Sequence, residues 1–119
     1  MELNIDASPH GRGFLIYIDD EEYQITLSSL KLLILLVKGR LSEGDGWVYP
    51  EDLSINKYLH TSIYKLNKET DNLLPIENDK CRRCYRLALD LVYFDIVEIN
   101  KENIIAIGDH FLIDLVKGL

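Results

Sequence analysis

The chain of 119 residues is poor in cysteine, and its two cysteines, Cys81 and Cys84, stand close together. Two cysteines cannot form the disulfide framework that stabilises many small secreted domains. They also cannot complete a structural zinc site, which needs four ligands, because the three histidines are scattered along the chain. We therefore expect no metal and no cofactor. A metal-binding or redox role for the pair is the alternative, since the neighbouring basic residues favour the reactive thiolate.

Long apolar runs are lacking as well. The longest nearly apolar stretch, residues 30–37, is interrupted by Lys31 and is far shorter than the ~20 residues that span a bilayer. Residues 1–13 contain neither the basic nor the apolar region of a secretory signal. A composition of 47% hydrophobic and 28% charged residues is typical of one soluble globular domain. We expect a cytoplasmic protein without a membrane partner.

Catalytic signatures are also missing from the sequence. It has no glycine-rich phosphate loop, no Gly-x-Ser-x-Gly, no His-Glu-x-x-His and no coherent pair of carboxylates for acid–base chemistry. The acidic run Asp19–Glu22 lacks the alternating ligands of a calcium loop and reads as a solvated turn. We expect no enzymatic activity.

Positive charge is in deficit, because 13 Lys and Arg stand against 20 Asp and Glu, a formal net charge of −7. Bulk acidity of this kind disfavours nucleic acid as a partner. The charge is unevenly distributed, however. Residues 57–86 contain seven basic and four acidic residues, a net +3, which leaves −10 on the rest of the chain. The basic segment is the main indication of a partner.

The apolar pattern predicts an α+β fold that begins with a hairpin. Residues 1–13, with one proline and two glycines, read as a flexible lead-in. Residues 14–18 and 23–25 predict two short strands around a polar turn. The domain proper therefore starts at residue 14.

Three helices are expected next. The apolar positions of residues 27–41 follow helical spacing and predict a core helix, with Thr26 or Ser28 as its N-cap. Pro50 suits the first position of a short helix that extends to about Ile55. A third helix is predicted over residues 56–70. Its apolar side chains fall on one face and form a single buried stripe, namely Leu59, Ile63 and Leu66.

The remaining segments predict two hairpins and a helix. Residues 73–76 and 84–89 can pair as strands, with residues 78–83 at the tip. Another strand pair is expected from residues 94–99 and 104–107. Asp109 is expected to cap a last amphipathic helix over residues 111–117.

This order of elements describes a winged helix-turn-helix, and the sequence resembles the winged-helix output domain of OmpR/PhoB-type response regulators. Four segments carry the resemblance: Ile25–Leu36, Trp47–Leu53, Leu59–Lys68 and Ile76–Leu87. Ser29, Asn67 and Cys84 depart from the family pattern, which has Glu, Arg and Gly at these places. The resemblance implies a winged-helix domain over residues 14–89. Because no receiver domain is visible ahead of it, we expect this domain to act alone and not under phosphorelay control.

The basic segment supplies the predicted DNA-binding residues. The third helix can enter the major groove of double-stranded DNA while the tip of the hairpin reaches the phosphate backbone. Donors and cations on the helix and at the tip are the candidates: His60, Thr61, Tyr64, Lys65, Lys68, Lys80, Arg82, Arg83 and Arg86. We therefore expect a DNA-binding transcription regulator. The alternative is a winged-helix module that binds proteins and not DNA, with the acidic remainder as the docking surface.

Residues 90–119 form an apolar extension beyond the expected hairpin. They can pack on the same domain and complete its core, or they can form a dimer interface. A homodimer would suit a protein that reads two half-sites of DNA. Both possibilities follow from the same apolar side chains.

Overall fold

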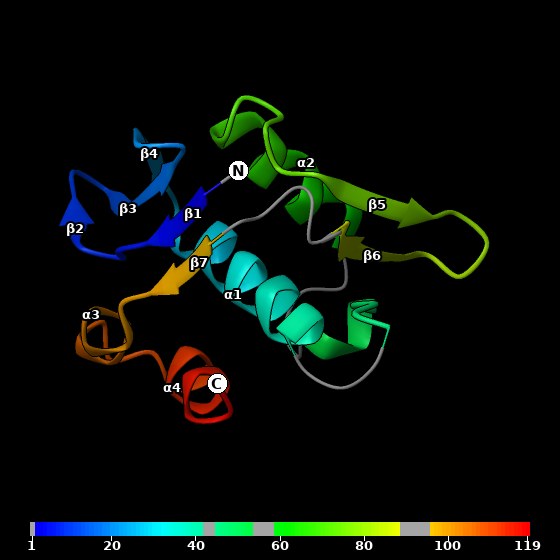
Figure 1. Cartoon of the computed structure of the whole chain (residues 1–119). Coiled ribbons are helices and arrows are strands. Elements are labelled where there is room, and N and C mark those ends of the chain that lie inside the picture. Colours follow the sequence, from blue (N-terminus) through cyan, green and yellow to red (C-terminus); the bar gives the residue numbers. More distant parts are fainter. Residues whose placement is uncertain (1, 42–44, 54–58, 89–95) are drawn as a thin grey trace.

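A five-stranded sheet combines the start of the chain with a strand near its end (Figure 1). In the computed structural model, which describes residues 2–41, 45–53, 59–88 and 96–119, β3 pairs antiparallel with β4 on one side and with β1 and β2 on the other. β7 pairs with β1 in parallel. The strands are β1 (Glu2–Ile5), β2 (Pro9–His10), β3 (Gly13–Ile18), β4 (Glu21–Ile25) and β7 (Ile96–Ile99).

The expectation of a lead-in over residues 1–13 is wrong, because β1 lies inside the sheet between β3 and β7. Leu3 and Ile5 are 1% and 0% exposed, and they join Ala7 in the hydrophobic core. Apolar side chains at every second position place one face of β1 against the interior. The proline and glycines that suggested a loose segment instead lie around β2 and the turn that leads into β3.

The hairpin expected after residue 13 is confirmed as β3 and β4, with five residue pairs in register from Phe14↔Ile25 to Ile18↔Glu21. Asp19 and Asp20 form its turn, with φ of +50° and +67°. A two-residue hairpin favours this left-handed conformation, which aspartate tolerates better than most residues.

The core helix is confirmed as α1 (Leu27–Leu41), with the predicted bounds. It lies at the centre of the molecule (Figure 1) and contacts the sheet, α2 (Leu59–Glu69), α4 (His110–Lys117) and the strand β6 (Cys84–Leu87). Leu30, Leu33, Ile34 and Val37 are fully buried. No helix within the described part of the chain is long and apolar enough to cross a membrane.

The second half of the fold places a short helix, a longer helix and a hairpin in succession. These are η1 (Pro50–Leu53), α2 (Leu59–Glu69), β5 (Ile76–Asp79) and β6 (Cys84–Leu87). The predicted residues 54–58 of the two helices lie outside the described residues. Val48, ahead of η1, forms an isolated bridge to Tyr85 and so joins this segment to the hairpin.

The first strand of this hairpin is displaced from its predicted position, residues 73–76, to Ile76–Asp79. Asp71 and Asn72 end α2 with φ of +52° and +58°, and the Asn72 N–H donates to the carbonyl of Asn67 at 2.8 Å. The chain leaves α2 through this left-handed turn, and Leu74 then packs into the hydrophobic core. These residues are therefore not available for the strand that the apolar pattern predicted here.

The predicted strand pair of residues 94–99 and 104–107 is wrong in its second member. Only β7 is a strand, and it pairs with β1; residues 101–106 form the helix α3 (Lys101–Ala106). The Asn100 side chain accepts a hydrogen bond from the N–H of Asn103 at 3.0 Å, so the polar run read as a turn is a helix N-cap. The β-branched run after it suggested a strand, but the cap and burial of Ile104 favour the helix.

The last predicted helix is confirmed as α4 (His110–Lys117), and Asp109 caps it as expected by accepting from the N–H of Leu112 at 3.1 Å. Leu112, Leu115 and Val116 are buried in the same hydrophobic core as the sheet and α1. Within residues 96–119, the strand β7 and the helices α3 and α4 therefore contribute to the common core.

Candidate nucleic-acid interface

The outer face of α2 presents every candidate residue that the sequence assigned to this helix. Leu59, Ile63 and Leu66 form the predicted buried stripe, at 3%, 5% and 0% exposure. Ser62 is buried beside them at 9% exposure, whereas the other polar side chains between them are exposed, with Tyr64 at 67%. The exposed set is His60, Thr61, Tyr64, Lys65 and Lys68. An exposed aromatic flanked by donors and cations can contact bases and phosphates together.

The C-terminal end of α2 is held against the start of α1. The two carboxylate oxygens of Glu69 accept from the N–H of Thr26 at 2.9 Å and from the hydroxyl of Ser29 at 2.5 Å. The N-terminus of α1 carries partial positive charge, which a carboxylate stabilises. Lys65 adds a bond from its ammonium to the hydroxyl of Ser28 at 3.3 Å. These contacts set the orientation of α2 relative to the core.

A groove of about 490 Å³ separates the first turn of α2 from the hairpin. It brings together three candidate residues from two elements, His60 of α2 with Lys80 and Arg83 of the hairpin tip. Within the described residues neither Lys80 nor Arg83 pairs with a carboxylate. The remaining lining residues are Pro50, Leu59, Asn78 and Tyr85. The groove is thus open to an anion from outside.

The other two hairpin cations lie on the opposite face. Successive side chains of a strand point to opposite faces, so Arg86 faces away from its neighbour Tyr85, which lines the groove. Arg86 pairs with Glu77 at 2.6 Å, and its guanidinium carbon lies 4.3 Å from the ring centroid of Trp47. It also donates to the carbonyl of Asp45 at 3.1 Å. Arg86 is therefore occupied within the chain.

Arg82 is engaged in a similar way. It pairs with Asp79 at 2.7 Å and lies 5.1 Å from the centroid of the Trp47 ring. Its side-chain hydrogen bond holds the pKa of Asp79 below its ordinary value, and the same pairing raises the pKa of Arg82. A further bond of 3.3 Å runs from Arg82 to the hydroxyl of Tyr49. The structure thus divides the four hairpin cations into an open pair and an internally bonded pair.

The two cysteines lie apart in their surroundings. Cys81 is exposed at the tip of the hairpin, Cys84 is buried at the start of β6, and both are free thiols. Among the described residues no group of three or more His, Cys, Asp or Glu side chains could hold a metal ion. Cys81 therefore lies in the turn of the hairpin and Cys84 in the hydrophobic interior beneath it.

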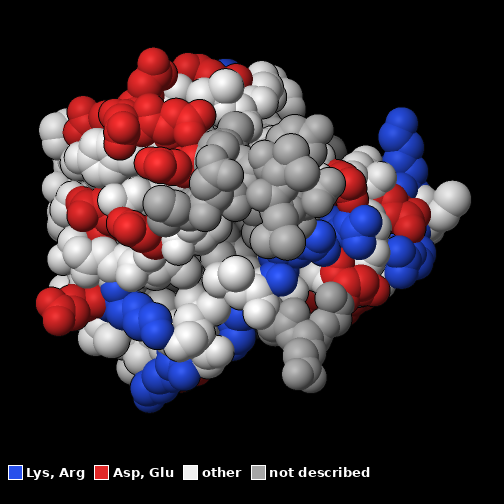
Figure 2. Space-filling model, in the orientation of Figure 1, with Lys and Arg blue, Asp and Glu red and all other residues white. Residues whose placement is uncertain are grey.

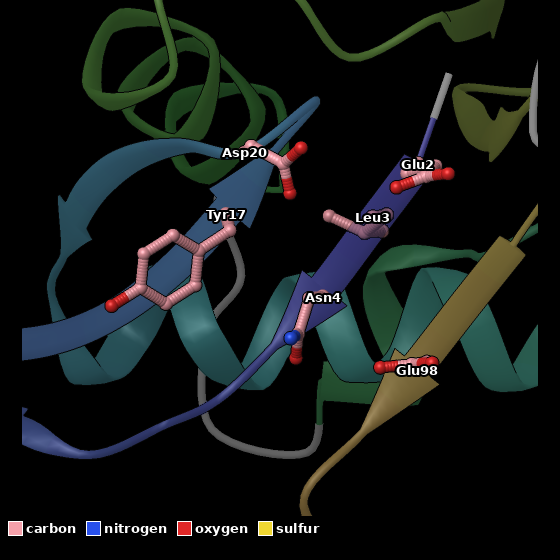
Figure 3. Close-up of a pocket in the computed structure, with 6 residues that line it drawn as sticks. All are labelled: Glu2, Leu3, Asn4, Tyr17, Asp20 and Glu98. Carbon is pink, nitrogen blue, oxygen red and sulfur yellow. The ribbon is translucent and has the colours of Figure 1, made fainter.

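Acidic side chains gather on the N-terminal sheet, while basic and acidic side chains alternate around the hairpin (Figure 2). Figure 3 shows the hollow of about 350 Å³ on this sheet, where Glu2, Glu98 and Asp20 lie beside Asn4 and Tyr17. Phosphate groups are repelled from such a surface. This face of the sheet therefore disfavours contact with nucleic acid.

Comparisons with protein-family models, with curated proteins and with solved structures found no match to this chain. The interface is therefore defined by its own geometry. Sequence reasoning missed Trp47, whose ring contacts both Arg82 and Arg86. It also missed Glu69, whose carboxylate joins α2 to the start of α1. No local signal identifies either residue, because Trp47 lies far along the chain from Arg82, as does Glu69 from Ser29.

Proposed function

We propose that this chain is a winged-helix DNA-binding protein that regulates transcription, with α2 in the major groove and the β5–β6 hairpin on the adjacent backbone. The succession of α1, η1, α2 and hairpin supports the proposal, as does the resemblance to OmpR/PhoB-type output domains. The bridge between Val48 and Tyr85 supports it further, because it ties the segment before η1 to the hairpin beside α2.

The single observation that carries the proposal is the groove shared by His60, Lys80 and Arg83. It joins the exposed face of α2 to the two open cations of the hairpin, so one strand of DNA could contact both elements. Lys65 and Lys68 extend the cationic surface along the helix. His60, Thr61 and Tyr64 offer the contacts to base edges.

The number of available cations sets the strength of binding. Lys65, Lys68, Lys80 and Arg83 are four candidate phosphate contacts, which corresponds to a salt slope of about −3 to −4 for duplex DNA. This is a small electrostatic contribution for a chain whose net charge is −7. We therefore propose that the DNA-bound form is a homodimer, because two subunits double the number of contacts.

Binding of a labelled duplex of mixed sequence, followed by fluorescence anisotropy at two salt concentrations, tests the function. The double variant Lys80→Glu and Arg83→Glu should abolish binding that the unmodified chain shows at low salt. Arg12→Glu with Lys117→Glu changes the net charge equally at two exposed positions away from the groove and should retain most of the affinity. Absence of binding to diverse duplexes at low salt would refute the proposal.

A protein-interaction module without DNA binding is the second candidate. The observation in its favour is that Arg82 and Arg86 are neutralised by Asp79 and Glu77, so the hairpin carries less available charge than its sequence suggests. A protein partner that is captured equally by the unmodified chain and by the Lys80→Glu, Arg83→Glu variant, together with no binding of DNA, would support this function.

A further inference from the structure

One edge of the main sheet has no neighbour among the described residues. β7 is the last strand in the order, and its pairing to β1 occupies only one of its two sides. The Asn100 N–H donates to the carbonyl of Ile5 at 2.9 Å. Because main-chain groups alternate in direction along a strand, Val97 and Ile99 direct theirs to the opposite side. That edge is a template for a further strand.

An apolar groove of about 320 Å³ runs beside this edge. Its lining includes the side chains of Val97 and Ile99 and two more aliphatic residues, Leu41 and Leu119. Leu41 is the last residue of α1 and is 57% exposed, although the residues Leu36 and Val37 before it are fully buried. The burial of α1 therefore ends before its last residue, and the side chain of Leu41 is exposed at the groove.

Two lysines at the groove define the charge of a suitable ligand. Lys38 and Lys101 both line it, and among the described residues the Lys101 ammonium donates to a terminal oxygen of Leu119 at 2.6 Å. The other face of β7 is acidic, because Glu98 lies opposite Asn4 and lines the same hollow as Glu2 and Asp20 (Figure 3). A strand that pairs with β7 therefore needs apolar side chains and carboxylates on the face that carries the groove. It needs side chains without negative charge on the face that carries Glu98.

We propose that β7 binds an extended segment of a partner protein as a sixth strand, with apolar side chains in the groove and carboxylates on Lys38 and Lys101. Main-chain bonds to Val97 and Ile99 supply affinity, and the groove selects alternate side chains, as in other cases of strand addition. A second copy of this chain fits less well. If two copies paired through their β7 strands by two-fold symmetry, the face with the lysines would lie on the same side of the joint sheet in both copies. Lysines of one copy would then lie near lysines of the other, and Glu98 would lie near Glu98.

The test uses the full chain, labelled with ¹⁵N, and the blocked peptide Glu-Thr-Val-Thr-Ile-Thr-Glu. This peptide places its Glu, Val and Ile side chains on one face and its Thr side chains on the other. We expect saturable shifts of the Val97, Ile99 and Leu41 amide signals. The same peptide with Lys in place of Glu should bind about tenfold more weakly, because each Glu loses a charge-assisted contact.

Matched variants locate the site. Leu41→Glu and Lys38→Glu should each weaken the peptide by about tenfold. Leu73→Glu, at another exposed leucine, and Arg12→Glu, at another exposed cation, should change affinity by less than about twofold. No saturable binding at millimolar peptide, or equal binding of the Lys peptide, would overturn the proposal. So would a dimer, seen by light scattering, that Leu41→Glu dissociates, because the second copy would then be the occupant.

Discussion

The hydroxyl of Ser29, in the first turn of α1, donates to the carboxylate of Glu69, at the end of α2, across 2.5 Å. Ser29 is 1% exposed, so water does not replace this bond readily. The same carboxylate accepts from the N–H of Thr26, the residue before α1. One side chain therefore joins the core helix to the helix that bears the candidate base contacts.

Replacing Glu69 should destabilise the protein. Glu69→Ala leaves the Ser29 hydroxyl and the Thr26 N–H without their acceptor, which should cost about 1–3 kcal/mol in the free energy of unfolding. Urea titration of Glu69→Ala, Ser29→Ala and the double variant gives the coupling between the two residues. Glu102→Ala, in the first turn of α3, is the exposed control. Strictly additive losses would contradict the bond.

Removal of Trp47 should loosen the hairpin. Trp47→Ala removes the ring over which both Arg82 and Arg86 lie, and each cation–π contact at such a site is worth about 0.5–1 kcal/mol. We expect faster amide hydrogen exchange in β5 and β6 and little change in β1 and β3. Trp47→Phe keeps an aromatic ring and should restore most of the protection; equal exchange in all three proteins would refute this role.

The hairpin cations should separate into two classes in DNA-binding experiments. Lys80→Ala with Arg83→Ala should reduce the salt slope by about 2, since each lost phosphate contact changes it by about 0.9. Arg82→Ala with Arg86→Ala removes the same charge but acts on the bonds to Asp79 and Glu77. The second pair should therefore lower stability while the slope changes little, which binding isotherms at several salt concentrations will show.

Stability should depend on Asp109 in acid. Burial raises the pKa of Asp109, but the hydrogen bonds from Lys31 and from the N–H of Leu112 lower it by more, so its pKa in the folded chain is below the ordinary value. The contribution of Asp109 to the free energy of unfolding is therefore complete above the pKa of about 3.9 that it has in the unfolded chain. This contribution is lost as the pH falls through the lower pKa of the folded chain.

Asp109→Ala should cost about 1 kcal/mol at neutral pH through loss of the helix cap. The difference in the free energy of unfolding between the variant and the unmodified chain should shrink below about pH 4, because Asp109 of the unmodified chain is then protonated. Urea unfolding at pH 7 and at successively lower pH measures both free energies. Asp114→Ala, at an exposed position in the middle of α4, is the matched control and should show little dependence of this kind. A difference that grows in acid would contradict the assigned role of Asp109.

The sequence by itself determined the elements whose signals are local. The apolar spacing of residues 27–41 and the Asp109 cap predicted α1 and α4, and the alternation around Asp19 and Asp20 predicted the first hairpin. The exposed face of α2 followed from its buried stripe. These features depend on neighbours within a few residues, where periodicity and capping act.

Only the tertiary structure decided which distant segments meet. The parallel pairing of Glu2 with Ile96 joins the start of the chain to a segment more than 90 residues later, and it makes a strand of residues that were read as a lead-in. The division of the hairpin cations depends on Trp47, and the anchoring of α2 depends on Glu69. Each of these contacts joins complementary surfaces far apart along the chain. The local pattern of apolar and polar residues does not predict these contacts, because they are stabilised by burial and by partners that come together only in the complete fold.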